Sequence, residues 1–437
     1  MAQVDTVIVG LGKTGLSCAR YLKKNNIAYA IWDTRDMPAG LEEAKALNCD
    51  GGIILSALNG AELAGYKTII LSPGLSPDLD ELVFARAQGC EIVGDIELFA
   101  RVADKPIIGI TGSNGKSTVT TLVGNMLQAA GMKPGVGGNI GLPALELLNE
   151  AADVYVLELS SFQLETTTRL KCHSAVVLNV SEDHIDRHGS VAHYAAIKSS
   201  IYHQCQHAFV NRDDAVVLAM QPNATSFGLG ATEKPHWGVS EGWLAQGDYE
   251  FLDPDMLKVK GQHNWSNMLI SFALATSVGA TVPQCLSAAY AFTGLSHRTE
   301  WVSDYNHVTW VNDSKATNVG ATVAAVDGMQ EPVVLIAGGE GKGADFSPLK
   351  SAVSTSARAL ILLGRDAPLI QSAVGESVPT YLVDDMPSAV SKAFEVAKSG
   401  DVVMLSPACA SFDMYKNYEH RGQVFVDAVL QLQREQS

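Results

Sequence analysis

The chain has 437 residues, of which 47% are hydrophobic, and it carries 31 lysines and arginines against 47 aspartates and glutamates. Its length predicts two or three domains of about 100–200 residues each. The formal net charge of −16 argues against a nucleic-acid-binding protein, because phosphate backbones are bound by clustered cations. Small phosphorylated ligands are not excluded, since a few local donors suffice to bind them.

The sequence predicts a cytoplasmic protein without a membrane partner. A strand-like run begins at residue 4 without a basic leader or cleavage site, and no stretch of about 20 apolar residues occurs. The seven cysteines are scattered and form no CxxC pair. We therefore expect reduced thiols rather than disulfides or a zinc site.

Strand-like and helix-like runs alternate along the chain, and most of the strand-like runs are continuously apolar. Buried strands of parallel sheets have this pattern. The expected strands lie at residues 4–9, 29–33, 68–74, 106–111, 154–160, 175–180, 309–313, 333–339, 359–364 and 401–407. The fold class is therefore α/β with several doubly wound sheets, and residues 211–255, which lack periodicity, predict an irregular or antiparallel insertion.

The first chemical motif is the glycine turn Gly10 to Gly15, which fits GxGxxG, follows a strand and opens a helical pattern. Asp33 ends the next strand, where a ribose-binding carboxylate would lie in a nicotinamide site. Three interpretations stay open: an NAD(P) oxidoreductase, another diphosphate ligand, or a tight turn without a ligand.

The second motif is GSNGKS, residues 112–117, which follows the strand expected at residues 106–111. It ends as a P-loop ends, although Ile110 stands where that pattern requires glycine. Backbone N–H groups at the start of a helix would bind phosphate, Lys116 would reach the β- and γ-oxygens, and Ser117 would ligate Mg²⁺. The alternative is a surface turn with a solvated lysine.

Further along, Glu158 ends a strand and would act as a magnesium-binding acid beside such a loop. The alternative is an ordinary polar strand end. The next turn gathers five acidic and histidine side chains, which predict either a metal or substrate contact or a solvated turn: Glu182, Asp183, His184, Asp186 and His188. Lys198 lies on an expected helix, where most lysines are solvated.

Together the motifs resemble the Mur ligases, ATP-dependent amide-forming enzymes of peptidoglycan synthesis. They occur in the expected order across nearly the whole chain: TGSNGKST, LELSSFQLE, NVSEDHIDRH, YAAIK, KGQHNWSN, GLSHRTEWV, NDSKATN, AGGEGKGADF and LSPACASFDMYKNYEHRG. The branch that adds D-glutamate is the most similar, through GLGKTGLSC, WDTR, SPG, VGDIELF and SPACASFD.

The resemblance implies an α/β fold of three domains: an N-terminal Rossmann-like, UDP-binding domain (1–93), a central P-loop ATPase-like domain with a mostly parallel sheet (94–298), and a C-terminal Rossmann-like, amino-acid-binding domain (299–437). It implies a monomeric ligase that joins D-glutamate to the carboxylate of UDP-N-acetylmuramoyl-L-alanine through an acyl phosphate. That step would serve cell-wall biogenesis, cell shape and cell division.

The same resemblance implies roles for individual residues. ATP would be bound by Gly112, Ser113, Asn114, Gly115, Lys116, Ser117, Thr118, Asn267, Arg298 and Asp313. The UDP-sugar would be bound by Lys13, Thr14, Asp33, Thr34, Arg35, Ser72, Pro73, Gly74, Asn139 and His184. The amino acid would meet Lys342, Ser411 and Phe412, and two further substrate-binding residues, Lys315 and Thr317, lie in the same C-terminal motif as Asp313. Two Mg²⁺ ions would involve Ser117, Glu158, His184 and Lys198, and the catalytic groups would be Lys116, Lys198, His184 and Arg298.

Lys198 changes most in significance, because its family counterpart carries a carbamate formed with CO₂. The modification would turn a cation that repels Mg²⁺ into an anionic ligand. Two other enzyme classes predict different behaviour. A regulatory or motor NTPase would hydrolyse ATP without an amino acid, and an oxidoreductase would give no reason for Lys116 and Ser117.

Overall fold

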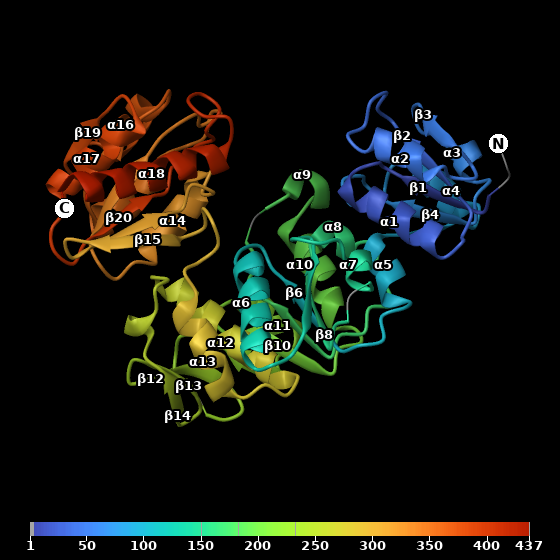
Figure 1. Ribbon diagram of the computed structural model, residues 1–437, viewed down its shortest axis with the longest axis horizontal. Coiled ribbons are helices and arrows are strands. Elements are labelled where there is room, and N and C mark those ends of the chain that lie inside the picture. Colours follow the sequence, from blue (N-terminus) through green and yellow to red (C-terminus); the bar gives the residue numbers. More distant parts are fainter. Residues whose placement is uncertain (1–3, 150, 182, 232, 437) are drawn as a thin grey trace. The chain divides into compact units, whose positions relative to one another are not determined.

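The computed structural model describes residues 4–149, 151–181, 183–231 and 233–436, except for the side chains of Asp186 and Gln436. The chain divides into two compact units, one formed by residues 1–252 and 267–289 and the other by residues 253–266 and 290–437. Figure 1 shows that helices cover the sheets of both units. Across the described ranges, no helix is long and apolar enough to cross a membrane.

The N-terminal sheet is parallel and has the strand order β3-β2-β1-β4-β5. Its strands are β1 (Thr6–Val9), β2 (Tyr29–Asp33), β3 (Ile53–Leu55), β4 (Thr68–Leu71) and β5 (Glu91–Val93). Its helices are α1 (Lys13–Lys24), α2 (Leu41–Leu47), α3 (Gly60–Leu63) and α4 (Asp80–Ala87). Every residue of β2 is buried, as expected for a strand covered on both faces.

The second sheet has nine strands in the order β14-β13-β12-β11-β10-β9-β6-β8-β7. Its strands are β6 (Ile107–Thr111), β7 (Pro134–Gly138), β8 (Val154–Glu158), β9 (Ser174–Val177), β10 (His207–Asn211), β11 (Thr225–Phe227), β12 (Trp237–Ser240), β13 (Trp243–Gln246) and β14 (Tyr249–Leu252). Strands β6 to β11 pair in parallel, whereas β12, β13 and β14 pair antiparallel with one another.

Helices accompany this sheet along the chain. They are α5 (Asp95–Ala100), α6 (Lys116–Ala129), α7 (Ala144–Leu147), α8 (Ser161–Leu164), α9 (Ile185–His188), α10 (Val191–Ser199), η1 (Ser200–Tyr202), α11 (Ala215–Met220), η2 (Pro254–Met256), α12 (Gln262–Ser277) and α13 (Val282–Ala291). Strands β6 and β8 are neighbours, with Ile110 paired to Glu158. The loop after β6 and the carboxylate that ends β8 therefore lie at the same edge of the sheet.

The third sheet has the order β15-β16-β20-β17-β18-β19, with only the β15–β16 pair antiparallel. Its strands are β15 (Glu300–Tyr305), β16 (Val308–Asn312), β17 (Val333–Ala337), β18 (Ala357–Leu362), β19 (Thr380–Leu382) and β20 (Val402–Leu405). Its helices are α14 (Val319–Asp327), α15 (Leu349–Ser356), α16 (Ala367–Val374), α17 (Met386–Val396) and α18 (Tyr418–Gln436).

All ten strands expected from the sequence are present, because continuous apolar runs fit strands that are buried on both faces. The region 211–255 was only partly predicted. Its antiparallel part is real, but β11 extends the parallel sheet beside β10. The glycine-rich β7 carried no apolar run and was missed.

Candidate active site

The loop between β6 and α6 has the backbone of a phosphate-binding turn. Gly112 and Gly115 have φ of +153° and +83°, in the region that favours glycine. A Cβ on Gly115 would lie 2.9 Å from Asn267 Oδ1, so the loop also packs closely against α12. Asn114 N donates to Asn179 Oδ1 (2.8 Å), which ties the loop to the segment after β9. Of the loop residues, Ser117 is buried and Thr118 is half-buried at the start of α6.

Two lysines meet at this loop. Lys116 Nζ donates to Gly112 O (2.7 Å) and Ser113 O (2.8 Å), and Lys198 Nζ donates to the same Gly112 O (2.9 Å). Lys198 is only 1% exposed, although it comes from α10 rather than from the loop. Burial, and after it the charge of the Lys116 ammonium, lower the pKa of Lys198 to about 7, while Asp183 opposes the shift. The amine therefore loses its proton far more easily than an exposed lysine.

Glu158 ends β8 beside the loop and is 3% exposed. Its Oε1 accepts from Asn139 Nδ2 (2.7 Å), and its backbone O accepts from Asn139 N (2.8 Å). Its Oε2 is buried and, among the described residues, has no hydrogen-bond partner. A buried carboxylate oxygen without a donor is costly unless another group binds it, so it is a suitable ligand for a cation.

His184 lies in the turn before α9 with φ of +53°, an unusual conformation for a residue other than glycine. Its side chain is 47% exposed, and Nε2 lies 3.5 Å from Asp183 Oδ2. The ring packs against Phe162, with centroids 4.9 Å apart. Glu182 lies outside the described residues, as does the side chain of Asp186.

At the N-terminal glycine turn, Asp33 is held by protein groups. Its Oδ2 accepts from Leu11 N (2.6 Å) and Arg35 Nη2 (2.8 Å), and its Oδ1 accepts from Arg35 Nε (2.9 Å). Hydrogen bonds from the Arg35 guanidinium lower the pKa of Asp33 to about 2. The carboxylate thus braces the turn through Leu11 N and the Arg35 guanidinium.

Lys13 begins α1, and its Nζ donates to Gly141 O (2.5 Å), next to the loop of Asn139. A Cβ on Gly10 would lie 2.6 Å from Ser72 Cβ, so the loop after β4 packs directly on the glycine turn. The remaining predicted UDP-sugar residues are half-buried or exposed around these two loops: Thr14, Thr34, Pro73 and Gly74.

In the C-terminal unit, Asp313 follows β16 and is 8% exposed. It accepts from Ser406 Oγ (2.8 Å) and Thr299 N (3.1 Å). Burial raises the pKa of Asp313 to about 7, against these hydrogen bonds and the charge of the exposed Arg298. The carboxyl group is therefore poised between its two protonation states near neutral pH.

Lys315 lies two residues further on, and its Nζ is 3.9 Å from the centroid of the Tyr418 ring. Burial lowers the pKa of Lys315. Thr317, two residues after Lys315, is exposed. Tyr418 was not selected from the sequence, although YKNYEHRG was among the motifs that carried the resemblance; an aromatic side chain alone gives no sign that it will lie over a lysine.

Three further predicted residues come together at the carboxyl ends of β17 and β20. Lys342 has φ of +50°, and its Nζ is 5.4 Å from the centroid of Phe412, which is 63% exposed. Ser411 beside it is 2% exposed. The two loops are joined by a pair of backbone hydrogen bonds between Glu340 and Ala410, each 2.9 Å. Ligands of open α/β sheets bind at this end of the strands.

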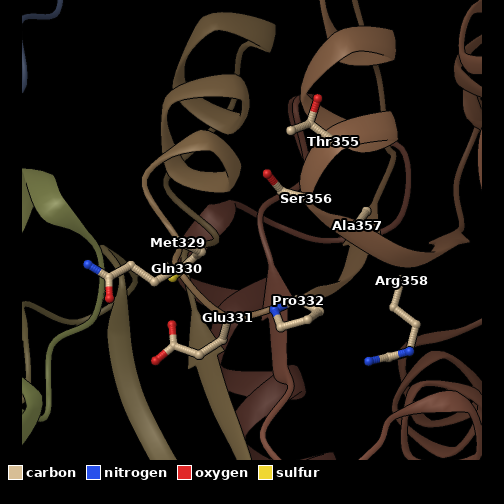
Figure 2. Close-up of a pocket in the computed structure, with 8 residues that line it drawn as sticks. All are labelled: Met329, Gln330, Glu331, Pro332, Thr355, Ser356, Ala357 and Arg358. Atoms are coloured by element: carbon tan, nitrogen blue, oxygen red, sulfur yellow. The ribbon is translucent and has the colours of Figure 1, made fainter.

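A separate hollow of about 300 Å³ lies at the opposite, amino ends of β17 and β18. Figure 2 shows its lining, residues 329–332 and 355–358. It contains none of the predicted site residues. Arg358 at its margin forms an ion pair with the buried Asp401, Nη2 to Oδ1 being 2.8 Å. This hollow is therefore not the candidate active site.

Related proteins are similar to this chain over nearly their whole length. A UDP-N-acetylmuramoylalanine--D-glutamate ligase from Marinobacter nauticus is 48% identical over 430 residues, 96% of either chain. Ligases of the same name from Hahella chejuensis and Pseudomonas aeruginosa are each 46% identical, covering 96% and 98% of this chain and 97% and 98% of their own. The chain belongs to the Mur ligase family.

Three domain families of the Mur ligases match in chain order. The MurD-like N-terminal domain matches residues 4–94, the middle domain residues 110–275, and the glutamate ligase domain residues 297–409. Mur ligases are ATP-dependent amide-forming enzymes that use Mg²⁺. The predicted α/β fold of three domains is confirmed. The boundaries after residues 93 and 298 stay predictions.

Solved Mur ligase structures share the fold of this chain at low sequence identity. A UDP-N-acetylmuramate-alanine ligase from Thermotoga maritima has a TM-score of 0.59 at 18% identity, over 98% of this chain and 99% of its own. A pseudomurein peptide ligase type C from Methanothermus fervidus has a TM-score of 0.58 at 17% identity, over 98% and 100%. At these identities the likeness bears on the fold alone.

Proposed function

We propose that this Mur ligase joins D-glutamate to the carboxylate of UDP-N-acetylmuramoyl-L-alanine, with ATP converting that carboxylate into an acyl phosphate. The protein would act in the cytoplasm as a monomer and serve peptidoglycan precursor synthesis. Relatives that carry the name of this ligase, 46–48% identical over at least 96% of the chain, support the choice of substrates.

One observation carries the proposal that ATP is bound and consumed. Lys116 and Lys198 both bond to Gly112 O, beside a buried carboxylate, Glu158, with an unpartnered oxygen. The Lys116 cation and the backbone N–H groups at the start of α6 would attract a triphosphate, and the carboxylate beside them, with a carbamate on Lys198, would hold its metal. A turn that binds a phosphate group which does not react would need neither Lys198 nor Glu158.

The protein groups around Glu158 fit Mg²⁺. Glu158 Oε2 and the Ser117 hydroxyl are hard oxygen ligands, and His184 lies in the turn that precedes α9. Across the described ranges, no three His, Cys, Asp or Glu side chains gather to hold a metal by themselves. Mg²⁺ does not need such a cluster, because it takes most of its ligands from water and substrate phosphates. When bound, it would offset the charge of the phosphoryl oxygens.

Lys198 would supply a ligand for a second Mg²⁺ after carbamylation. The neutral amine attacks the carbon of CO₂, an N–C bond forms, and one N–H proton passes to water, which leaves an N-linked carboxylate. The lowered pKa of Lys198 supports this step, because only the neutral amine has the lone pair that attacks.

Amide formation then needs two displacements. The alanyl carboxylate attacks the γ-phosphorus of ATP and ADP leaves; the amine of D-glutamate attacks the new acyl carbon, phosphate leaves and the nitrogen loses a proton. Lys116 and Arg298 would stabilise the developing negative charge. The remaining ATP contacts would come from residues 112–115, Thr118, Asn267 and Asp313, while D-glutamate would meet Lys342, Ser411 and Phe412. Lys315 and Thr317, in the same motif as Asp313, would be further substrate-binding residues.

The UDP-sugar would lie along the N-terminal glycine turn. Lys13, Thr14, residues 33–35 and residues 72–74 would surround its nucleotide, and Asn139 and His184 would contact its sugar side. The hydrogen bond from Lys13 to Gly141 supports the proposal that one substrate contacts both regions, because it brings the glycine turn next to the loop of Asn139.

The test is a phosphate-release assay with ATP and Mg²⁺, in which the UDP-sugar and the amino acid are varied separately. We expect release only when UDP-N-acetylmuramoyl-L-alanine and D-glutamate are both present, and little release with L-glutamate or other amino acids. Vigorous release from ATP alone would instead identify an NTPase, and release with another amino acid would contradict the proposed specificity.

A further inference from the structure

His188 is a buried residue near the candidate site that has no role in the proposed mechanism. It ends α9 and is 4% exposed. Its Nε2 lies 3.0 Å from Ser161 Oγ, and its Nδ1 lies 3.1 Å from Glu165 Oε1. Both edges of the ring are therefore next to polar groups of α8 and the residue that follows it. Nδ1 has no hydrogen-bond partner among the described residues, so Glu165 is only close to it, and the ring is held at Nε2 by Ser161.

The His188 ring touches two aromatic side chains, and each of them touches a predicted metal-site residue. Phe162 stacks on His188, with centroids 5.3 Å apart and planes at 22°, and packs against His184 at 4.9 Å. Tyr194 lies 5.1 Å from His188, and its ring carries Lys198 Nζ at 4.3 Å. His188 is thus the centre of a row of rings between His184 and Lys198.

Both outer members of this row need support. His184 is half exposed and has a strained backbone, and Lys198 has a long side chain with several rotamers. Tyr194 is further fixed because its Oη lies 3.4 Å from Ser113 Oγ in the phosphate-binding loop. Because hydrogen bonds hold His188 and Tyr194 in place, their rings can support His184 and Lys198 in one orientation.

We propose that His188 is a positioning residue: through Phe162 and Tyr194 it holds His184 and Lys198 in the orientation in which they would meet Mg²⁺. This inference rests on the proposed function, which assigns those two residues to the metal. His188 itself touches neither substrate nor metal. The hydrogen bond with Ser161 holds the ring, and its contacts with Phe162 and Tyr194 would pass that position on to His184 and Lys198.

The experiment uses Mn²⁺ as a probe in place of Mg²⁺ and is done in the presence of ADP. Binding is measured as the loss of the electron paramagnetic resonance signal of free Mn²⁺. Outer partners of metal ligands commonly change metal affinity by about 10- to 100-fold. We expect His188→Ala to weaken Mn²⁺ binding by about tenfold or more. His188→Phe, which keeps a ring in both contacts, should recover most of the affinity. His203→Ala is the matched control, because that histidine is exposed and follows directly after η1.

A double-mutant cycle then tests the path. If His188 acts through Phe162, His188→Ala and Phe162→Leu together should weaken binding by less than the product of their separate effects. A merely structural role predicts that Mn²⁺ affinity per folded molecule, counted by near-UV circular dichroism, is unchanged in every variant. Affinity within twofold of the parent in folded His188→Ala overturns the proposal. If that variant does not fold, a failure of Phe162→Leu to weaken binding overturns it.

The two hypotheses fail differently. If the parent protein releases no phosphate with D-glutamate and the UDP-sugar, the proposed function fails, whereas Mn²⁺ affinity still reports on positioning. If the parent is an active ligase and the folded variants bind Mn²⁺ as it does, only the role of His188 is wrong.

Discussion

Lys198 illustrates how strongly burial changes the chemistry of a single residue. On an exposed helix face its ammonium would stay protonated, but at 1% exposure and beside Lys116 its pKa falls to about 7. Asp313 shows the opposite shift for the same reason, since burial raises the pKa of its carboxyl to about 7. In both residues the environment favours the neutral form, which an exposed lysine or aspartate hardly populates at neutral pH.

The first prediction concerns the pH dependence of carbamylation. Because the pKa of Lys198 is lowered to about 7, the amine is protonated below this value and neutral above it. At constant dissolved ¹³CO₂, the carbamate signal in ¹³C NMR should therefore rise from about pH 6 to about pH 8. Lys198→Ala is the control and should lack the signal. A profile that is flat over this range would contradict the prediction.

The second prediction concerns the function of that lysine. Lys198→Ala should lower ligase activity by about 100-fold, because the extra anionic metal ligand is lost. Small carboxylic acids or high bicarbonate should restore part of the activity by occupying the same space. The exposed Lys171→Ala variant serves as control and should behave like the parent. Unchanged activity in Lys198→Ala would rule out the carbamate.

At the scale of elements, the site is assembled where parallel strands end. Strand β6 leads into the phosphate-binding loop, its neighbour β8 ends in Glu158, and β7 ends at Gly138. Gly138 has φ of +102°, and a Cβ there would lie 2.4 Å from Glu158 O. The close approach of these two strand ends brings Asn139 to both the backbone and the side chain of Glu158.

The third prediction tests the close contact between the ends of β7 and β8. Gly138→Ala should destabilise the protein by about 3 kcal/mol, because it adds a clash with backbone to an unfavourable φ. Gly131→Ala is the matched control: its φ is +83°, but a Cβ there would meet nothing within 4 Å. It should cost only about 1 kcal/mol. Thermal unfolding should separate them, with Tm about 5–10 °C lower for Gly138→Ala. Equal Tm values would show that the approach is not tight.

At the scale of the whole molecule, acidic residues outnumber basic ones, although local sites are cationic. The formal net charge is −16, yet the residues proposed to bind anionic ligands include Lys116, Lys315 and Lys342. A large net charge keeps chains apart in solution but opposes compaction through self-repulsion. We therefore expect one chain per particle in sedimentation equilibrium.

The fourth prediction follows from that repulsion. Raising ionic strength from about 0.01 M to about 0.15 M shortens the screening length from about 30 Å to about 8 Å. The Tm should rise, because repulsion among the excess carboxylates weakens more than the short ion pairs do. The measurement is a thermal scan in sodium chloride at constant pH. A falling Tm would mean that attractive pairs dominate.

Much of the fold and of the site followed from sequence patterns. Continuous apolar runs located the parallel strands, and the GKS signature located Lys116 and Ser117 at the start of α6. The roles given to Lys198 and Lys315 came from resemblance, since a lysine on a helix or loop has no local signal of burial. Tyr418 received no role, because an aromatic side chain is more often a packing group, and His188 was included only in a group of five side chains with a possible metal or substrate contact.

The sequence by itself determined which segments are buried strands and where glycines permit a phosphate-binding turn, because both depend on properties of neighbouring residues. Only the tertiary structure decided that Lys198 meets Lys116 at Gly112 O, that Asp33 braces its own turn, and that His188 stands between two aromatic rings. These contacts depend on which elements the fold brings together, as with Lys198 and Gly112, which are 86 residues apart, and the burial that sets their charge states exists only after the chain has folded.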